Sequence, residues 1–290
     1  MARTILWRAL AAFALAAFAL SSSAQSKAPA SPRLYVFNGG ELASETARYR
    51  LTDADVEEVP LSVASFLIVH PRGVLLWDAG AVADHERGGD VGFEQRLVRR
   101  DKAERFVKLA PTLVSQLASA GYKPSDVTYL ALSHYHWDHT ADANLFAGST
   151  WLVSKVEHDL MFSADPPGGA RPETYSALKN SKTVLITTAE HDVFGDGTVI
   201  MLSTPGHTPG HHSLLVKLAQ MGSVVLSGDF AHFGENYENG GVPIFNFNRA
   251  QTLASIDRIK KIAANTKATV VLQHDARDVG KLPAFPASAK

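Results

Sequence analysis

Four side chains that can bind metal ions lie within six residues, in the order His-x-His-x-Asp-His: His134, His136, Asp138 and His139. Residues 127–132 before them are apolar and mostly β-branched or aromatic, which predicts a buried strand ending at the cluster. Along a strand, His134 and His136 would point to the same face, whereas Asp138 and His139 fall in the following turn. We therefore expect two neighbouring metal sites, one for each pair, rather than one closed zinc site.

Further metal-binding residue types follow three other predicted strands. His207 lies in the turn Thr-Pro-Gly-His-Thr-Pro-Gly-His, which follows one strand. Asp229 comes shortly after the apolar residues 224–226, and His274 after the apolar residues 269–272. One such residue would normally be explained as a turn or core residue. Four strand ends that all carry metal-binding side chains instead indicate one site built at the carboxyl ends of the strands.

The chemistry expected of such a site is metal-assisted hydrolysis. Two divalent cations outweigh the charges of Asp138, Asp229 and a bridging hydroxide, which leaves a positive, Lewis-acidic centre. Such a centre generates hydroxide at neutral pH and stabilises the oxyanion that forms when hydroxide attacks a carbonyl group. Asp138 is the natural proton carrier between nucleophile and leaving group. The ligand types favour zinc, although iron, cobalt and manganese accept the same ligands.

The elements that must position these side chains are many short strands with helices between some of them. Residues 61–70 and 74–77 are predicted to form a hairpin. Further strands are expected at residues 34–37, 151–153, 184–186, 198–202, 212–216, 224–226 and 269–272. Helices are expected at residues 106–120, where Pro111 is a candidate first turn, at residues 155–162 and at residues 249–264. The charge-rich residues 84–104 are expected to form an exposed excursion. The pattern predicts sheets packed together and flanked by helices.

The amino terminus has the features of an export signal. Arg3 and Arg8 precede an apolar run, and Ser22 and Ala24 occupy the small positions of a cleavage site. We therefore expect a signal peptide at residues 1–24, a flexible tether at residues 25–32 and a single domain at residues 33–290. The apolar run is too short to span a bilayer, so an exported protein, periplasmic or secreted, with no membrane span after cleavage is expected.

Composition excludes several function classes. The chain has no cysteine, so its stability must come from core burial and bound metal rather than from disulfides. The formal net charge is −1, which provides no electrostatic basis for binding nucleic acid or an anionic membrane. The hydrolytic centre described above indicates a small-molecule lactone or ester as the partner. The sequence does not distinguish a monomer from a homodimer.

Taken together, these motifs resemble the metallo-β-lactamase superfamily of dinuclear hydrolases, and the likeness covers nearly the whole mature chain. Within that superfamily, residues 133–140 and 204–215 are most similar to the N-acyl-homoserine lactonases. The resemblance implies a four-layer αββα sandwich of the mixed α/β class, with the site at one edge. It implies that one ion is bound by His134, His136 and His207, and the other by Asp138, His139 and His274. It further implies that Asp229 bridges the two ions and that the chain opens lactone rings.

Several residues near the expected ligands allow two interpretations of their role. Asp78, in Trp-Asp-Ala-Gly, either orients a ligand, as the resemblance implies, or forms an ordinary turn. Trp137 either walls the substrate pocket or packs in the core. His232 stands where the lactonases carry a tyrosine that polarises the lactone carbonyl, and we expect its imidazole to donate the same hydrogen bond. Tyr237 is a substitute within reach. We expect one of the neighbours His211 and His212 to support the site and the other to be exposed to solvent.

The same sequence features also fit other functions. A β-lactamase is disfavoured because those enzymes lack a counterpart of Asp229, and a glyoxalase II-type thioesterase because the chain ends at Lys290, soon after His274. A general lactonase or esterase and a phosphotriesterase fit the same centre. The redox branch of the superfamily carries a glutamate where His136 stands. A periplasmic zinc-binding protein without catalysis is the alternative from another class. The sequence also does not decide whether residues 165–172 close over a substrate.

Overall fold

The computed structural model describes residues 29–43, 45–52, 54–56, 60–87, 94–98 and 104–290. The predicted signal peptide and the first part of the tether lie outside these residues. Among the described residues, no helix combines the length and apolar character needed to cross a bilayer.

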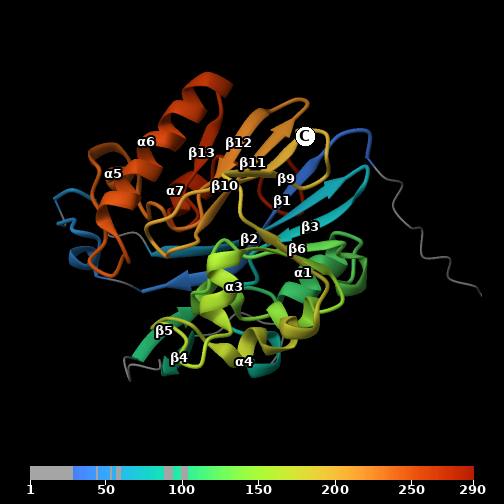
Figure 1. Cartoon of the computed structure of the whole chain (residues 1–290), viewed down its shortest axis with the longest axis horizontal. Coiled ribbons are helices and arrows are strands. Elements are labelled where there is room, and N and C mark those ends of the chain that lie inside the picture. The colour runs from blue at the N-terminus through green and yellow to red at the C-terminus, as the bar shows by residue number, and fades with distance from the viewer. Residues whose placement is uncertain (1–28, 44, 53, 57–59, 88–93, 99–103) are drawn as a thin grey trace, which may run out of the picture.

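The described strands form two sheets, which face each other in the middle of the molecule (Figure 1). The first sheet has the order β4-β5-β1-β2-β3-β6-β7-β8 and the second the order β13-β12-β11-β10-β9. The strands of the first sheet are β1 (Arg33–Leu42), β2 (Leu61–His70), β3 (Gly73–Trp77), β4 (Glu94–Val98), β5 (Glu104–Lys108), β6 (Tyr129–Ala131), β7 (Thr150–Ser154) and β8 (Thr183–Ile186). Those of the second are β9 (Glu190–Asp192), β10 (Val199–Ser203), β11 (His212–Leu218), β12 (Gly222–Leu226) and β13 (Thr269–Val271).

Helices cover the outer face of each sheet. The first sheet is covered by α1 (Leu113–Ser119), α2 (Trp137–Thr140), α3 (Lys155–Met161) and α4 (Pro172–Tyr175). The second is covered by α5 (Gly234–Asn239), α6 (Arg249–Thr266) and α7 (Ala276–Val279). This arrangement confirms the predicted αββα sandwich.

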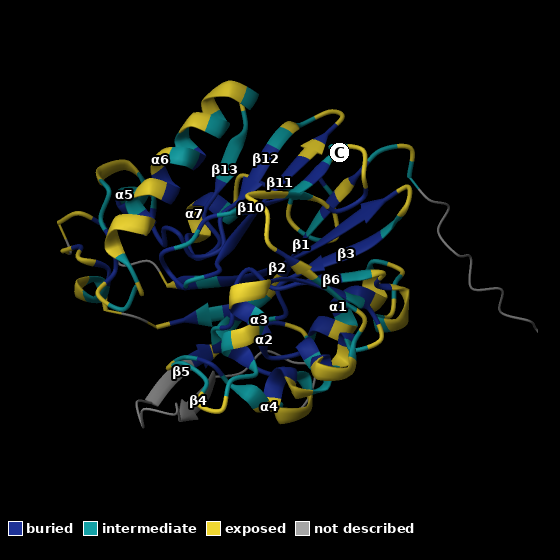
Figure 2. Cartoon of the chain, viewed as in Figure 1, coloured by how far each residue is buried: buried dark blue, intermediate teal, exposed yellow. Residues whose placement is uncertain are grey.

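The alternation of apolar side chains explains the layers. Residues from both sheets, such as Phe66, Trp77 and Leu214, share one buried cluster between them. Leu117 and Trp151 belong to a second cluster, under the helices of the first sheet, and Ile259 to a third, under α6. Figure 2 shows the consequence: the strands are largely buried, whereas the outward faces of the helices are exposed.

Three expected boundaries were wrong. The first strand continues past Phe37 because a β-bulge between Asn38 and Gly40 absorbs the glycines. Part of the predicted excursion at residues 84–104 forms β4, which pairs with β5 at the edge of the first sheet. The helix expected from residue 106 begins at Leu113, since Thr112 caps it by accepting the Ser115 N–H.

Candidate metal centre

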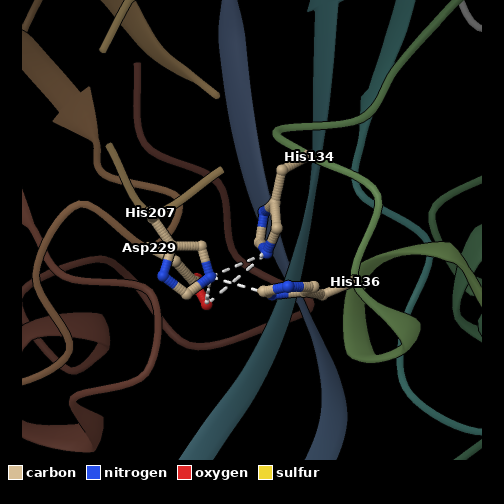
Figure 3. Close-up of side chains that lie close together, drawn as sticks. All are labelled: His134, His136, His207 and Asp229. Atoms are coloured by element: carbon tan, nitrogen blue, oxygen red, sulfur yellow. Dashed lines mark hydrogen bonds and ion pairs between the residues drawn. The ribbon is translucent and has the colours of Figure 1, made fainter. Parts of the chain in front are cut away.

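The His-x-His loop, the turn after β10 and the turn after β12 bring four side chains together (Figure 3). They are His134, His136, His207 and Asp229, and each offers one ligand atom within 4.8 Å of the others. The Nε2 atom of His207 lies 3.1 Å from Nε2 of His134 and 2.9 Å from Nδ1 of His136. Asp229 Oδ2 lies 3.3 Å from that same His207 nitrogen. Three imidazoles and a carboxylate thus converge on one point.

A second group lies on the other side of the Asp229 carboxylate and consists of Asp138, His139 and His274. Asp229 Oδ1 is 3.2 Å from Nε2 of His139 and 3.1 Å from Nε2 of His274. Asp138 Oδ2 is 3.7 Å from the same His274 nitrogen. The two oxygens of Asp229 therefore face different histidine clusters, which is the arrangement a bridging carboxylate requires.

Electrostatics and hydrogen bonding fit cations at this place. Burial lowers the pKa of His134, His136 and His207 well below its usual value, which keeps these rings in the neutral form that binds metal. Burial also lowers the pKa of His139, but Asp229 and Asp78 outweigh that effect and raise it. Asp229 Oδ1 is buried, and the groups beside it are the Nε2 atoms of His139 and His274. A buried carboxylate oxygen that faces imidazole nitrogens is suited to binding a cation.

Polar groups behind the rings of His207 and His274 fix their orientation. His207 Nδ1 donates to Asn246 Oδ1 at 3.0 Å, and His274 Nδ1 donates to the Ser62 carbonyl at 2.7 Å. In each case the bond leaves Nε2 of the ring free to face the centre. Partners of this kind fix the tautomer and orientation of metal-binding histidines.

Asp78, at the end of β3, contacts His139 from behind. Its Oδ2 accepts from His139 Nδ1 at 2.8 Å and from Gln273 Nε2 at 2.7 Å. Its Oδ1 accepts the Ser133 N–H at 2.6 Å. The residue has a φ of +60°, a conformation that aspartate tolerates better than most residues. Asp78 thus links the loop that carries His134 and His139 to Gln273, the residue that precedes His274.

His211 supports Asp229 rather than facing the cluster. Its Nε2 accepts the Asp229 N–H at 2.7 Å, and its Nδ1 lies 3.0 Å from the Thr204 carbonyl, to which it donates. Gly228 has a φ of +58°, and a Cβ there would come within 2.5 Å of His211 Nε2. The expectation that one of the two neighbouring histidines is exposed was wrong. His212 is also buried, and its Nδ1 donates to the Gly210 carbonyl at 2.8 Å.

The three remaining predicted site residues are His232, Trp137 and Tyr237. His232 is buried beside the ligands: its Nε2 lies 3.2 Å from Asp229 Oδ2, and its ring stacks on His274 at 5.3 Å. Trp137 is buried in the cluster of apolar side chains that includes Phe233. The structure does not bring Tyr237 to the histidines. Its ring packs against Phe230 and beneath the Lys260 ammonium group, in the cluster under α6.

The segment 165–172 contacts the site through Gly169. The Gly169 carbonyl accepts the Trp137 N–H at 2.9 Å, and a Cβ on Gly169 would lie 2.6 Å from Cδ2 of His136. Arg171 anchors the far end of the segment through Glu86 and Glu173. The segment is therefore packed against His136 and hydrogen-bonded to Trp137, the next residue in the chain.

A family model, the metallo-beta-lactamase superfamily, matches residues 59–274, which contain every residue of both groups. The chain belongs to the metallo-β-lactamase superfamily. The match extends over most of the chain, and the two facing sheets and the His/Asp cluster described above agree with it.

Relatives in this superfamily include several that are named for one activity. The N-acyl homoserine lactonase AttM of Rhizobium radiobacter is 30% identical over 84% of this chain and 93% of its own length. A solved N-acyl homoserine lactone hydrolase, with the product N-hexanoyl-L-homoserine bound at its metal centre, is 25% identical and aligns with a TM-score of 0.74. It covers 88% of this chain and 98% of its own. The dizinc quorum-quenching lactonase AidC is 18% identical, covers 89% of both chains and shares the fold with a TM-score of 0.63.

Sequence reasoning missed the groups that hold this metallo-β-lactamase site together. Asn246 lies 39 residues from His207 in sequence, in a segment with no recognisable pattern. Ser62 contributes through its carbonyl group, which any residue type would provide. The position of Gln273 at the site could have been predicted from the sequence, because Gln273 directly precedes His274 at a strand end.

Proposed function

We propose that this chain is a dinuclear metal-dependent hydrolase that opens the lactone ring of N-acyl-homoserine lactones. The observation that carries the proposal is the Asp229 carboxylate, whose two oxygens face two separate histidine clusters. The named activity of relatives about 30% identical over most of the chain supports this choice of substrate.

The protein would bind one ion through His134, His136 and His207 and the other through Asp138, His139 and His274, with Asp229 shared. Two such ions, when bound, supply a hydroxide nucleophile at neutral pH and polarise the carbonyl group under attack. The donor set of imidazole and carboxylate fits zinc, which we propose as the natural metal.

The side chains of this protein would then orient the lactone and move the proton. Asp138, the more exposed of the two aspartates, takes the proton of the nucleophile and delivers it to the alkoxide that leaves when the ring opens. His232 donates a hydrogen bond to the lactone carbonyl oxygen. Asp78 holds His139 in the orientation that binds metal.

We further propose that the protein acts after export. The basic residues, apolar run and small cleavage-site residues at the amino terminus support a signal peptide at residues 1–24. Fractionation of cells that express the full chain, with sequencing of the mature amino terminus, tests this location. Gel filtration of the mature protein distinguishes the monomer from the homodimer.

A hydrolysis panel on purified, metal-analysed protein tests the activity. The substrates are short- and long-chain acyl-homoserine lactones, plain γ- and δ-lactones, a β-lactam and a phosphotriester. We expect the highest kcat/KM with an acyl-homoserine lactone and two equivalents of metal per chain. Turnover confined to one of the other substrates would reassign the chain within the superfamily. Metal-loaded protein that hydrolyses none of them would instead support a zinc-binding role.

A further inference from the structure

Glu157 is a buried carboxylate that the proposed reaction does not use. It lies in the first turn of α3 with 2% of its surface exposed. Among the described residues, no lysine or arginine forms an ion pair with it. Burial raises the pKa of Glu157 to about 7. A carboxylate in such surroundings costs folding free energy, so its contacts need an explanation.

The two oxygens of Glu157 contact two different ligand loops. Oε2 accepts the N–H of Tyr135 at 3.1 Å, and Tyr135 stands between His134 and His136. Oε1 accepts the N–H of Gly210 at 2.8 Å, in the turn that carries His207. One side chain thus connects the backbone between His134 and His136 to the turn that carries His207, three residues before Gly210.

The packing around Gly210 shows that this contact is close. A Cβ at Gly210 would lie 2.5 Å from Ser154 Oγ and 2.8 Å from the Glu157 backbone nitrogen. The turn therefore rests directly on the beginning of α3, and a glycine is required there. A backbone hydrogen bond from His212 N–H to the Ser133 carbonyl, 2.9 Å long, joins the same two loops at a second place.

The second group of ligands is held by other residues. His139 is held by Asp78, and His274 by the Ser62 carbonyl. Neither contact involves Glu157 or α3. A change at Glu157 should therefore affect the two groups unequally.

We propose that Glu157 is a positioning residue that presets the spacing of His134, His136 and His207 and thereby the affinity of the first metal ion. The proposal rests on the two-metal centre proposed above and not on the identity of the substrate. A carboxylate is needed because each of its oxygens accepts a bond from one of two inward-pointing N–H groups. A glutamine has one acceptor and would direct N–H donors at the other loop.

The test uses three variants of the mature protein: Glu157→Gln, Glu157→Asp and, as a matched control, Asp159→Asn. Asp159 lies on the same helix but is exposed and pairs with Lys155. Each protein is stripped of metal and titrated with Zn²⁺ against a chromophoric chelator, which resolves two binding steps. A parallel Co²⁺ titration records the visible spectrum of each step.

We expect Glu157→Gln to weaken one of the two binding steps by about 10- to 100-fold, the range typical of residues that orient metal ligands. The other step, and both steps of Asp159→Asn, should be unchanged. Glu157→Asp retains the charge but is one methylene shorter, so it should weaken the same step by less and shift the Co²⁺ spectrum of that step alone.

Equal weakening of both steps, or no change in either, would overturn the proposal, since a purely structural role predicts one of these results. If Glu157→Gln does not fold, Glu157→Asp decides by the same criterion. Metal affinity is measured without any lactone. The inference therefore stands or falls separately from the proposed activity, which the substrate panel tests.

Discussion

At the scale of single residues, Asp229 and His211 determine how the two ligand groups meet. Asp229 is fully buried, and His211 fixes its backbone through the 2.7 Å bond from the Asp229 N–H. Each carboxylate oxygen is then directed at its own group of histidines. A position set by backbone and side chain together leaves little freedom for the bridge, as a preorganised catalytic centre requires.

His232 provides the first prediction. If its imidazole donates to the lactone carbonyl, His232→Phe should lower kcat/KM for an acyl-homoserine lactone by about 100-fold, the cost typical of losing one such donor. His232→Tyr, which restores a donor, should recover most of that loss. Steady-state kinetics and metal analysis of each variant check this.

The metal content distinguishes the donor from a different role, because His232 also lies at ligand distance from Asp229 and His274. A Phe variant that loses one metal equivalent would show that His232 is a ligand. Unchanged kcat/KM would show that His232 neither donates to the lactone carbonyl nor binds an essential metal ion.

Asp142 provides a prediction about stability. It is buried and accepts the Asp84 N–H at 2.8 Å, and burial together with the Asp84 carboxylate raises the pKa of Asp142 to about 8. The folded protein therefore holds a proton that the unfolded chain releases at lower pH. This contribution to stability is lost as pH rises through about 4 to 8.

Asp142→Asn should remove that loss, because an amide keeps the acceptor and gains a donor toward Asp84. We expect the variant to gain about 1–3 kcal/mol of unfolding free energy over the parent at about pH 9, and little or nothing at about pH 5. Urea denaturation of both proteins at the two pH values checks this. A difference that does not change with pH would contradict it.

At the scale of elements, the convergence of the candidate metal-binding residues was easier to predict than the segments between them. The strand ends that carry His134, His207, Asp229 and His274 were recognisable because apolar runs stop at metal-binding residue types. The bulge in β1 and the β4–β5 pairing were not, because long-range backbone pairing decided them against the local signal. Tyr237 illustrates the same limit: closeness in sequence did not predict which face of α5 it occupies.

The segment 165–172 provides a prediction at this scale. Gly169 has a φ of +87°, and a Cβ there would meet the His136 ring, whereas Gly168 has open space around it. Gly169→Ala should displace His136 and lower metal affinity by about tenfold or more, as losses around a ligand usually do. Gly168→Ala is the matched control and should bind metal normally. Chelator competition on both variants tests this. Equal metal affinities would show that the segment moves aside and leaves the His136 ring in place.

At the scale of the whole molecule, the site joins the two halves of the sandwich. His134, His136 and His139 follow β6 of the first sheet, whereas His207, Asp229 and His274 follow β10, β12 and β13 of the second. Bound metal would therefore connect the sheets. No disulfide contributes to this connection, because the chain contains no cysteine.

Metal removal should accordingly destabilise the entire fold. A ligand present at 1,000 times its Kd contributes about 4 kcal/mol, which for a chain of this size corresponds to a Tm loss of about 8–16 °C. Differential scanning calorimetry of metal-free and reloaded protein checks the loss and its recovery. A single transition at an unchanged temperature would show that the sandwich is stable without the ions.

The location of the candidate ligands on both sheets has a consequence for how long each copy of the protein survives. Copies that have not acquired their ions would open more often and be degraded first. Supply of the metal would then govern how much of the enzyme accumulates as well as how fast each molecule works.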